Sequence, residues 1–255
     1  MQQSLRNIKL TLEYDGTHYN GWQCQCKAQN AKCKIKTIQE TIEKALQKIL
    51  QEKTRLIVAG RTDAGVHAQA QVVNFKTKSK IPLKNIQLAL NSSLPKDIII
   101  TNIKNVSLDF HSQHDTKSKI YRYTILNRKY SSALLERFVY FYPYYLDIKL
   151  MQQEARYLIG IHNFKSFCVT KSCLKDNIRT IKRISVKKIN DLIYIEIEAD
   201  GFLHNMVRNI AGTLIEIGRG RFKKGYLKSI LLGKNRVLAG PCIPAKGLCL
   251  MRVNY

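Results

Sequence analysis

Apolar residues recur along this chain with the periods of strands and helices. In the first 107 residues, four short apolar runs predict strands, and two segments repeat apolar residues every three to four positions, as helices do. The first helix opens with the capping box Thr37-Ile38-Gln39-Glu40. The predicted elements are the strand Ile8–Tyr14, the helix that carries Ile38 to Ile49, the strands Leu56–Ala59 and Gln69–Phe75, the helix Pro82–Asn91 and the strand Ile98–Val106. This order is typical of a ferredoxin-like or RRM-like unit, an antiparallel sheet with both helices on one face.

The rest of the chain, residues 108–255, predicts a second α/β half. The predicted elements are the strand Ser118–Leu126, the helix Asp147–Leu158, the hairpin strands Ile178–Ile189 and Leu192–Asp200, and the helix Lys223–Leu232. A further helix is expected to open at Gly201, and its apolar stripe consists of Leu203, Met206, Val207, Ile210, Leu214 and Ile217. On this helix His204, Arg208 and Gly212 would share one flank, where an arginine most simply extends from the surface. We therefore predict an α+β protein with halves at 1–107 and 108–255.

The segment Arg137–Tyr145 is crowded with aromatic residues. Two interpretations stay open for it. β strands favour aromatic side chains, so a strand packed in the core is the preferred interpretation. A stacking platform for single-stranded bases is the alternative.

The charge balance narrows the class of partner. Lys and Arg together number 43, against 18 Asp and Glu, which gives a formal net charge of +25. Such a field attracts a polyanion, so RNA or DNA is an expected partner, although a general enrichment in Lys, Ile and Asn would also explain the charge. The first residues lack the apolar core of roughly 7–15 residues that a secretory signal needs. No run approaches the roughly 18 apolar residues of a membrane span.

Seven cysteines are scattered along the chain: Cys24, Cys26, Cys33, Cys168, Cys173, Cys242 and Cys249. An odd number without a secretory signal indicates reduced thiols, so we expect a cytoplasmic protein. Cys24-x-Cys26 with Cys33 would be compatible with a metal site. However, no paired Cys-x-x-Cys and no histidine partner has the spacing of zinc ligands, so no metal is expected.

The stretch Gly60-Arg61-Thr62-Asp63-Ala64-Gly65-Val66-His67-Ala68 connects two predicted strands. Its glycines let the backbone turn tightly or bring a substrate close to the chain. By itself, a Thr-Asp-x-Gly segment is a good hairpin turn in which the aspartate caps its own backbone. The alternative is a nucleophile, because an aspartate is ionised at neutral pH without a helper base and Arg61 would aim it. Carboxylates of this kind attack sugar or phosphoryl centres.

This nonapeptide, GRTDAGVHA, closely resembles the catalytic loop of the tRNA pseudouridine synthase A family, without gaps. The resemblance runs from Leu10 to Tyr255 and implies that Asp63 is the catalytic aspartate. The family segment at Lys119-Ile120-Tyr121-Arg122-Tyr123 implies that Tyr121 stacks on or hydrogen-bonds the target base, with a proposed role as general base. The residues alone do not favour Tyr121 over Tyr123.

The run from Phe202 to Ile210 is similar to a family helix whose arginine forms a salt bridge to the catalytic aspartate, a role that falls to Arg208. Substrate-binding roles are expected for Arg61, Tyr121, His67 and His204. The resemblance also implies that the two antiparallel sheets join into one mixed central sheet. Helices would pack on one side of it, and a basic active-site cleft would lie between the halves.

The reaction implied is the isomerisation of uridine to pseudouridine at positions 38, 39 and 40 in the anticodon arm of tRNA. The target uridine would be flipped out of its stem, at a cost of a few kcal/mol, with help from Arg61. Asp63 would attack the nucleotide, the C–N glycosidic bond would break, and the uracil would rejoin through C5. Whether the attack falls on the sugar or the base stays open. No metal or other cofactor is expected, and the family implies a homodimer.

Three positions depart from the family pattern. Cys24, Gln113 and Cys168 stand where the family usually has arginine, and the basic loop Cys26–Lys36 is longer than expected. These losses keep a non-catalytic tRNA-binding or chaperone protein on the same scaffold as the main alternative. A metal-dependent nuclease is a weaker one, because it needs clustered carboxylates and the loop has only Asp63.

Overall fold

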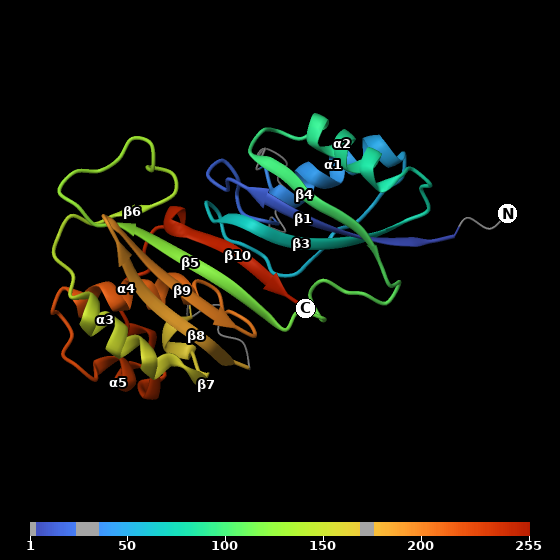
Figure 1. The fold of residues 1–255 in the computed structure, drawn as a ribbon. Coiled ribbons are helices and arrows are strands. Elements are labelled where there is room, and N and C mark those ends of the chain that lie inside the picture. The colour runs from blue at the N-terminus through green and yellow to red at the C-terminus, as the bar shows by residue number, and fades with distance from the viewer. Residues whose placement is uncertain (1–3, 24–35, 169–175) are drawn as a thin grey trace, which may run out of the picture. The chain divides into compact units, whose positions relative to one another are not determined.

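The computed structural model describes residues 4–23, 36–168 and 176–255. Helices and strands alternate through these residues, so the predicted α+β class is confirmed (Figure 1). The chain divides into two compact units, Met1–Lys117 with Leu250–Tyr255, and Ser118–Cys249. Within the described ranges, every helix is too short or too polar to span a lipid bilayer.

The sheet of the first unit is built around β1 (Arg6–Tyr14). This strand pairs antiparallel with β3 (His67–Thr77) on one side and with β4 (Ile98–Val106) on the other, and β2 (Ile57–Val58) pairs antiparallel with β3. The chain order β1-α1-β2-β3-α2-β4 and the strand order β4-β1-β3-β2 confirm the predicted ferredoxin-like pattern.

Two helices, α1 (Ile38–Leu50) and α2 (Leu83–Ser93), cover one face of this sheet (Figure 1). The predicted cap of α1 is present, because the Glu40 backbone N–H donates to Thr37 Oγ1 at 3.3 Å. Alternate residues of the strands point toward the helices and are fully buried. They include Ile8, Leu10, Leu12, Val73 and Phe75.

The first unit extends beyond the predicted division at residue 107, as far as Lys117. Two buried asparagines tie these extra residues to the sheet. Asn7 donates to the Phe110 carbonyl at 2.9 Å, and Asn74 accepts from the Ser112 backbone N–H at 2.9 Å. Asn74 also donates to Asn7 Oδ1 at 3.0 Å. Both side chains lie on the face of the sheet opposite the helices, where periodicity alone gives no sign of a partner.

The sheet of the second unit contains the predicted hairpin. The strands β8 (Ile178–Ile189) and β9 (Leu192–Ala199) pair antiparallel, with Asn190 in the left-handed region at φ +52°. On the other side of β9 lies β5 (Ser118–Leu126), also antiparallel, and β7 (Gly160–Asn163) pairs with β8. The short β6 (Tyr140–Phe141) is parallel to β5.

Three helices, α3 (Ile148–Ala155), α4 (Met206–Gly218) and α5 (Tyr226–Gly233), lie on one side of this sheet (Figure 1). The apolar stripe predicted for α4 is confirmed, and almost the whole circumference of the helix is buried. The last strand, β10 (Leu248–Asn254), crosses the division between the units after Cys249.

Two predictions about local structure are wrong. The aromatic segment 137–145 is not a core strand: only Tyr140–Phe141 is extended and paired, and the side chains of Tyr144 and Tyr145 are 69% and 81% exposed. The Tyr142 N–H still donates to the Leu126 carbonyl at 2.9 Å, and the pairing of this segment with β5 extends no further. The helix predicted from Gly201 begins only at Met206, after Asn205 in the left-handed conformation at φ +60°.

Candidate active site

The Gly60–Ala68 loop of the first unit leaves β2 and enters β3. Hydrogen bonds fix its backbone on both sides. Gln71 Nε2 donates to the Gly60 carbonyl at 2.9 Å, and the Trp22 backbone N–H donates to the Thr62 carbonyl at 3.0 Å. At the centre of the loop, the Val66 N–H donates to the Asp63 carbonyl at 3.2 Å, which closes a turn. The loop backbone is therefore held by Gln71 of β3 and by Trp22, which precedes α1.

Asp63 is the first residue of that turn. Gly65 stands at its third position with φ +75°, as a type II turn requires. The turn interpretation of the Thr-Asp-x-Gly segment is thus correct for the backbone. The Asp63 side chain is only half-buried and Arg61 is exposed, so the turn leaves both groups within reach of a ligand.

Two glycines let the segment before α1 approach the loop closely. A Cβ on Gly16 would lie 2.0 Å from the Val66 carbonyl oxygen, and a Cβ on Gly21 would lie 2.6 Å from the Thr62 carbonyl oxygen. Gly21 also has φ +78°, which side-chain-bearing residues rarely adopt. The sequence pattern gives no sign that this segment contacts the loop.

A buried hydrogen bond joins the loop to β1. The Tyr14 hydroxyl lies 2.8 Å from Thr62 Oγ1, and both side chains are nearly inaccessible to solvent. The sequence predicts Tyr14 as the last residue of a strand and does not indicate that its hydroxyl supports the loop.

His67 ends the loop at the start of β3 and is 5% exposed. Its Nδ1 lies 3.1 Å from the Gly16 backbone nitrogen and also 3.1 Å from Asp15 Oδ1. One ring nitrogen cannot serve both groups at once, because accepting from Gly16 needs a lone pair and donating to Asp15 needs a proton. In either tautomer this side of the imidazole holds the loop. Substrate binding by His67 stays a prediction.

In the second unit, Tyr121 and Tyr123 share the buried face of β5. Tyr123 is fully buried, and its hydroxyl donates to the Pro244 carbonyl at 2.6 Å. Burial raises the pKa of this hydroxyl, while Arg208 acts in the opposite direction. Tyr121 instead packs edge-on against Phe202, with ring centroids 5.0 Å apart. The hydroxyl of Tyr123 therefore has a structural partner, and a substrate role for Tyr121 stays a prediction.

Arg208 lies in the first turn of α4 and is half-buried. Its Nε donates to the Ile243 carbonyl at 2.7 Å, and its Nη1 donates to Asn205 Oδ1 at 2.7 Å. These two hydrogen bonds fix the orientation of the Arg208 guanidinium. His204 is exposed and lies in the turn before α4, so the prediction that it shares a helix flank with Arg208 is wrong.

The positions where arginine was expected differ in their surroundings. Gln113 is exposed, whereas Cys168 is fully buried behind the one-turn helix Lys165–Phe167. Cys24 and most of the Cys26–Lys36 loop lie outside the described residues, as does the alternative metal site at Cys24, Cys26 and Cys33. Among the residues that are described, no three His, Cys, Asp or Glu side chains gather as metal ligands do.

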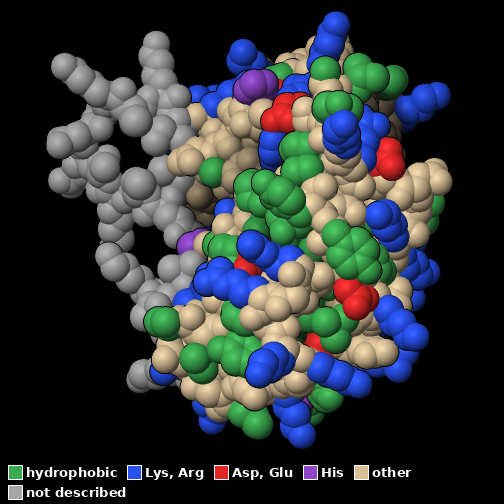
Figure 2. Space-filling view, turned by 90° about the vertical axis from the view of Figure 1, so that its left-hand side faces the viewer, with side chains coloured by type: hydrophobic (Ala, Val, Ile, Leu, Met, Phe, Trp, Pro, Cys, Tyr) green, Lys and Arg blue, Asp and Glu red, His purple; other side chains and the backbone are tan. Residues whose placement is uncertain are grey.

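The surface carries the excess positive charge that the composition requires. On the face drawn in Figure 2, Lys and Arg side chains are spread widely and acidic side chains are few. A surface of this kind favours a polyanionic partner.

Comparison with known proteins decides the family. The model of a family described as tRNA pseudouridine synthase matches residues 11–115 and 155–255. The chain belongs to the tRNA pseudouridine synthase family. It is 46% identical to tRNA pseudouridine synthase A 2 of Clostridium perfringens over 251 residues, which are 98% of this chain and 100% of that protein. With the same coverage, it is 45% identical to tRNA pseudouridine synthase A of Clostridium acetobutylicum and 46% identical to that of Caldicellulosiruptor saccharolyticus.

Family membership makes this chain an isomerase that forms pseudouridine in tRNA. The segments matched by the tRNA pseudouridine synthase family contain Arg61, Asp63, His67, His204 and Arg208. Tyr121 lies between the two matched segments, and its role stays a prediction from the resemblance of the surrounding sequence.

Proposed function

We propose that this tRNA pseudouridine synthase acts at positions 38, 39 and 40 of the anticodon arm, with Asp63 as its nucleophile. The observation that carries the proposal is the Gly60–Ala68 loop, whose backbone is bonded on both sides while the Asp63 carboxylate is only half-buried. A group held in this way loses little conformational freedom when it meets a substrate, and such positioning supplies a large part of catalysis.

The chemistry follows from a carboxylate and a flipped uridine. Asp63 attacks the nucleotide at the sugar or at the base, and the bond between N1 and C1′ breaks. The uracil turns, C5 bonds to C1′, and the bond between the nucleotide and Asp63 breaks, which restores the carboxylate. The hydrogen on C5 then leaves as a proton and N1 gains one, so the reaction is a balanced isomerisation without an oxidant or reductant.

The other candidates serve the same step. Arg208, aimed by Asn205 and by the Ile243 carbonyl, would pair with the Asp63 carboxylate and keep it ready to attack. Tyr121 would stack on the target base or hydrogen-bond it, and Arg61 would hold the flipped state. His204, exposed in the turn before α4, and His67 would contact the nucleotide or its neighbours.

The first experiment measures tritium release from C5-labelled uridine in an unmodified tRNA transcript. We expect release by the wild type and none by Asp63→Asn, since an amide is a poor nucleophile. Asp109→Asn is the matched control, because Asp109 is an exposed aspartate of the same unit, outside the Gly60–Ala68 loop. If the wild type bound tRNA but released no tritium, the chaperone alternative would replace this proposal.

Two further measurements define the substrate and the assembly. Transcripts in which two of the three uridines are replaced by cytidine should each still release tritium, and a transcript lacking all three should not. We propose that the enzyme is a cytoplasmic homodimer. Light scattering should then give a mass near twice the 29.4 kDa of the chain, and a clean monomer would contradict that part of the proposal.

A further inference from the structure

A hollow in the second unit combines three basic side chains. The loop after α5 and Lys165 of the one-turn helix Lys165–Phe167 enclose a cavity of about 670 Å³. Its lining includes Lys165, Lys234, Asn235, Arg236 and Val237, and we call it the loop pocket. Lys165, Lys234 and Asn235 are exposed around it, so a ligand can reach it from solvent.

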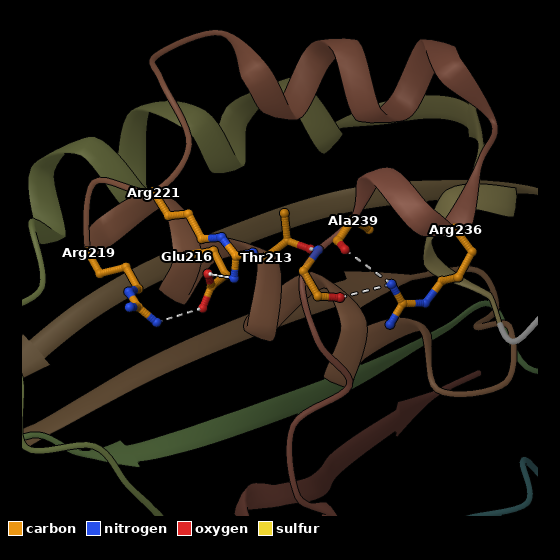
Figure 3. Close-up of polar contacts among 7 residues, drawn as sticks. Thr213, Glu216, Arg219, Arg221, Arg236 and Ala239 are labelled. Atoms are coloured by element: carbon orange, nitrogen blue, oxygen red, sulfur yellow. Dashed lines mark hydrogen bonds and ion pairs between the residues drawn. The ribbon is translucent and has the colours of Figure 1, made fainter.

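The cations of the loop pocket have no acidic partner among the described residues. No described carboxylate lies within ion-pair distance of Lys165, Lys234 or Arg236. Figure 3 shows the contrast along α4: Arg219 and Arg221 both contact the buried Glu216, at 3.3 and 3.0 Å, whereas Arg236 contacts only uncharged oxygens. Three cations without counter-charge around one hollow favour an anionic ligand.

Arg236 is fixed before any ligand arrives. Its Nη1 donates to the Ala239 carbonyl at 3.3 Å, as Figure 3 shows, and to the Gly240 carbonyl at 2.9 Å. Its Nη2 donates to Oδ1 of the fully buried Asn209 at 2.9 Å, and Asn209 in turn donates to the Phe167 carbonyl at 2.7 Å. A guanidinium has five N–H donors, so these three bonds leave two, including Nε–H, for a ligand. A pair of donors of this kind matches the geometry of a phosphate.

Close packing fixes the loop against α4. A Cβ on Gly212 would lie 2.0 Å from the Pro241 carbonyl oxygen, and a Cβ on Gly240 would lie 2.7 Å from Thr213 Cα. The Gly240 N–H also donates to Thr213 Oγ1 at 2.9 Å. The loop is thus part of the same rigid body as Arg208, which precedes Asn209 in α4 and bonds the Ile243 carbonyl.

We propose that the loop pocket binds a backbone phosphate of the RNA substrate, away from the nucleotide that reacts. The cavity is larger than one phosphate needs, and Val237, which is 86% exposed, offers an apolar surface for the adjoining ribose. Arg236 bonds Asn209, the residue after Arg208 in α4, so an RNA strand that contacts Arg208 would have a second anchor on the same unit. The inference rests on the proposed function, because it takes tRNA as the ligand.

The test compares two double variants of the full-length enzyme. Lys165→Ala with Lys234→Ala removes two charges from the pocket and leaves Arg236, which also holds the loop. Lys223→Ala with Lys228→Ala is the matched control, since it removes two exposed charges at and before α5 that do not line the pocket. The measurements are Kd for an unmodified tRNA transcript at several salt concentrations, and kcat and KM for tritium release.

We expect the pocket variant to raise Kd and KM about tenfold at 0.1 M salt and to leave kcat unchanged, because the reacting groups are intact. The slope of log Kd against log salt should fall by about one for each lysine that contacts a phosphate, and by clearly less in the control. Equal Kd values and equal slopes in the two double variants would overturn the proposal.

Inorganic phosphate provides the second arm of the test. If phosphate bound at millimolar concentration or below, and the pocket variant lost that binding while its affinity for tRNA stayed normal, the pocket would hold a free anion and the RNA proposal would be wrong. Failure of the proposed function can be distinguished from failure of the RNA-binding proposal. A wild type that releases no tritium still gives a Kd and a salt slope, and these alone decide whether RNA occupies the pocket.

Discussion

Gly21→Ala should damage the Gly60–Ala68 loop without touching any group proposed to react. Two effects add at this position. Alanine in the left-handed region, at φ +78°, costs about 1–2 kcal/mol. The new Cβ would also lie 2.6 Å from the Thr62 carbonyl oxygen and 3.0 Å from the Asp63 carbonyl carbon.

The steric contact requires movement of the loop itself. Ordinary contact begins near 3.4 Å, so Thr62 and Gly21 must separate by about 0.8 Å. Forced shifts of packed backbone cost about 1–3 kcal/mol, which brings the expected loss of unfolding free energy to about 2–5 kcal/mol. Misplacement of a reacting group by about 1 Å costs up to about 100-fold in rate, so kcat should fall by about 10- to 100-fold.

The chain provides the controls that separate the two effects. Gly220 has φ +81° and no atom within 4 Å of an added Cβ, so Gly220→Ala should cost only the backbone strain and leave kcat unchanged. Gly16→Ala has no such strain but places a Cβ 2.0 Å from the Val66 carbonyl oxygen, so it should lower kcat through the clash alone. Urea titrations and tritium release measure both quantities. If Gly21→Ala folded stably and reacted at the wild-type rate, the loop would not need the support that we describe.

Tyr123→Phe removes the hydroxyl that donates to Pro244, so the free energy of unfolding should fall by about 1–3 kcal/mol in urea titrations with kcat unchanged. A loss of kcat at full stability would contradict this structural role. Burial raises the pKa of Tyr123 above its unfolded value near 10, so its contribution to stability is complete below about pH 10 and is lost as pH rises through the folded pKa. Urea midpoints measured above about pH 10 should therefore fall more steeply in the wild type than in Tyr123→Phe. Glu154 is fully buried on α3, and its carboxylate accepts from the backbone N–H groups of Gly225 and Leu227, at 2.7 and 3.3 Å, at the start of α5. Glu154→Gln should cost about 1–3 kcal/mol and speed hydrogen exchange in α5, whereas unchanged exchange would show that α5 does not need this cap.

The sequence by itself determined most of the secondary structure, because the patterns involved are local. Strand alternation located β1, β4, β5 and the β8–β9 hairpin to within a few residues, and a capping box located the start of α1. The Gly60–Ala68 loop was found because one short segment carries both its turn and its carboxylate. The net charge of +25 indicates a polyanionic partner from composition alone, because it does not depend on how the chain folds.

Only the tertiary structure decided the features that depend on distant contacts. Tyr121 and Tyr123 are equivalent in strand periodicity, and only the fold brings Pro244, 121 residues after Tyr123, to accept the hydrogen bond of the Tyr123 hydroxyl. The roles of Gly16 and Gly21 depend on backbone atoms some 40 to 50 residues later in the chain. Helix α4 begins after His204 because Asn205 adopts a left-handed backbone conformation. The Asn205 side chain accepts a hydrogen bond from Arg208. Periodicity predicts which face of a strand or helix a residue occupies. Tertiary packing decides which atoms from distant parts of the chain contact it.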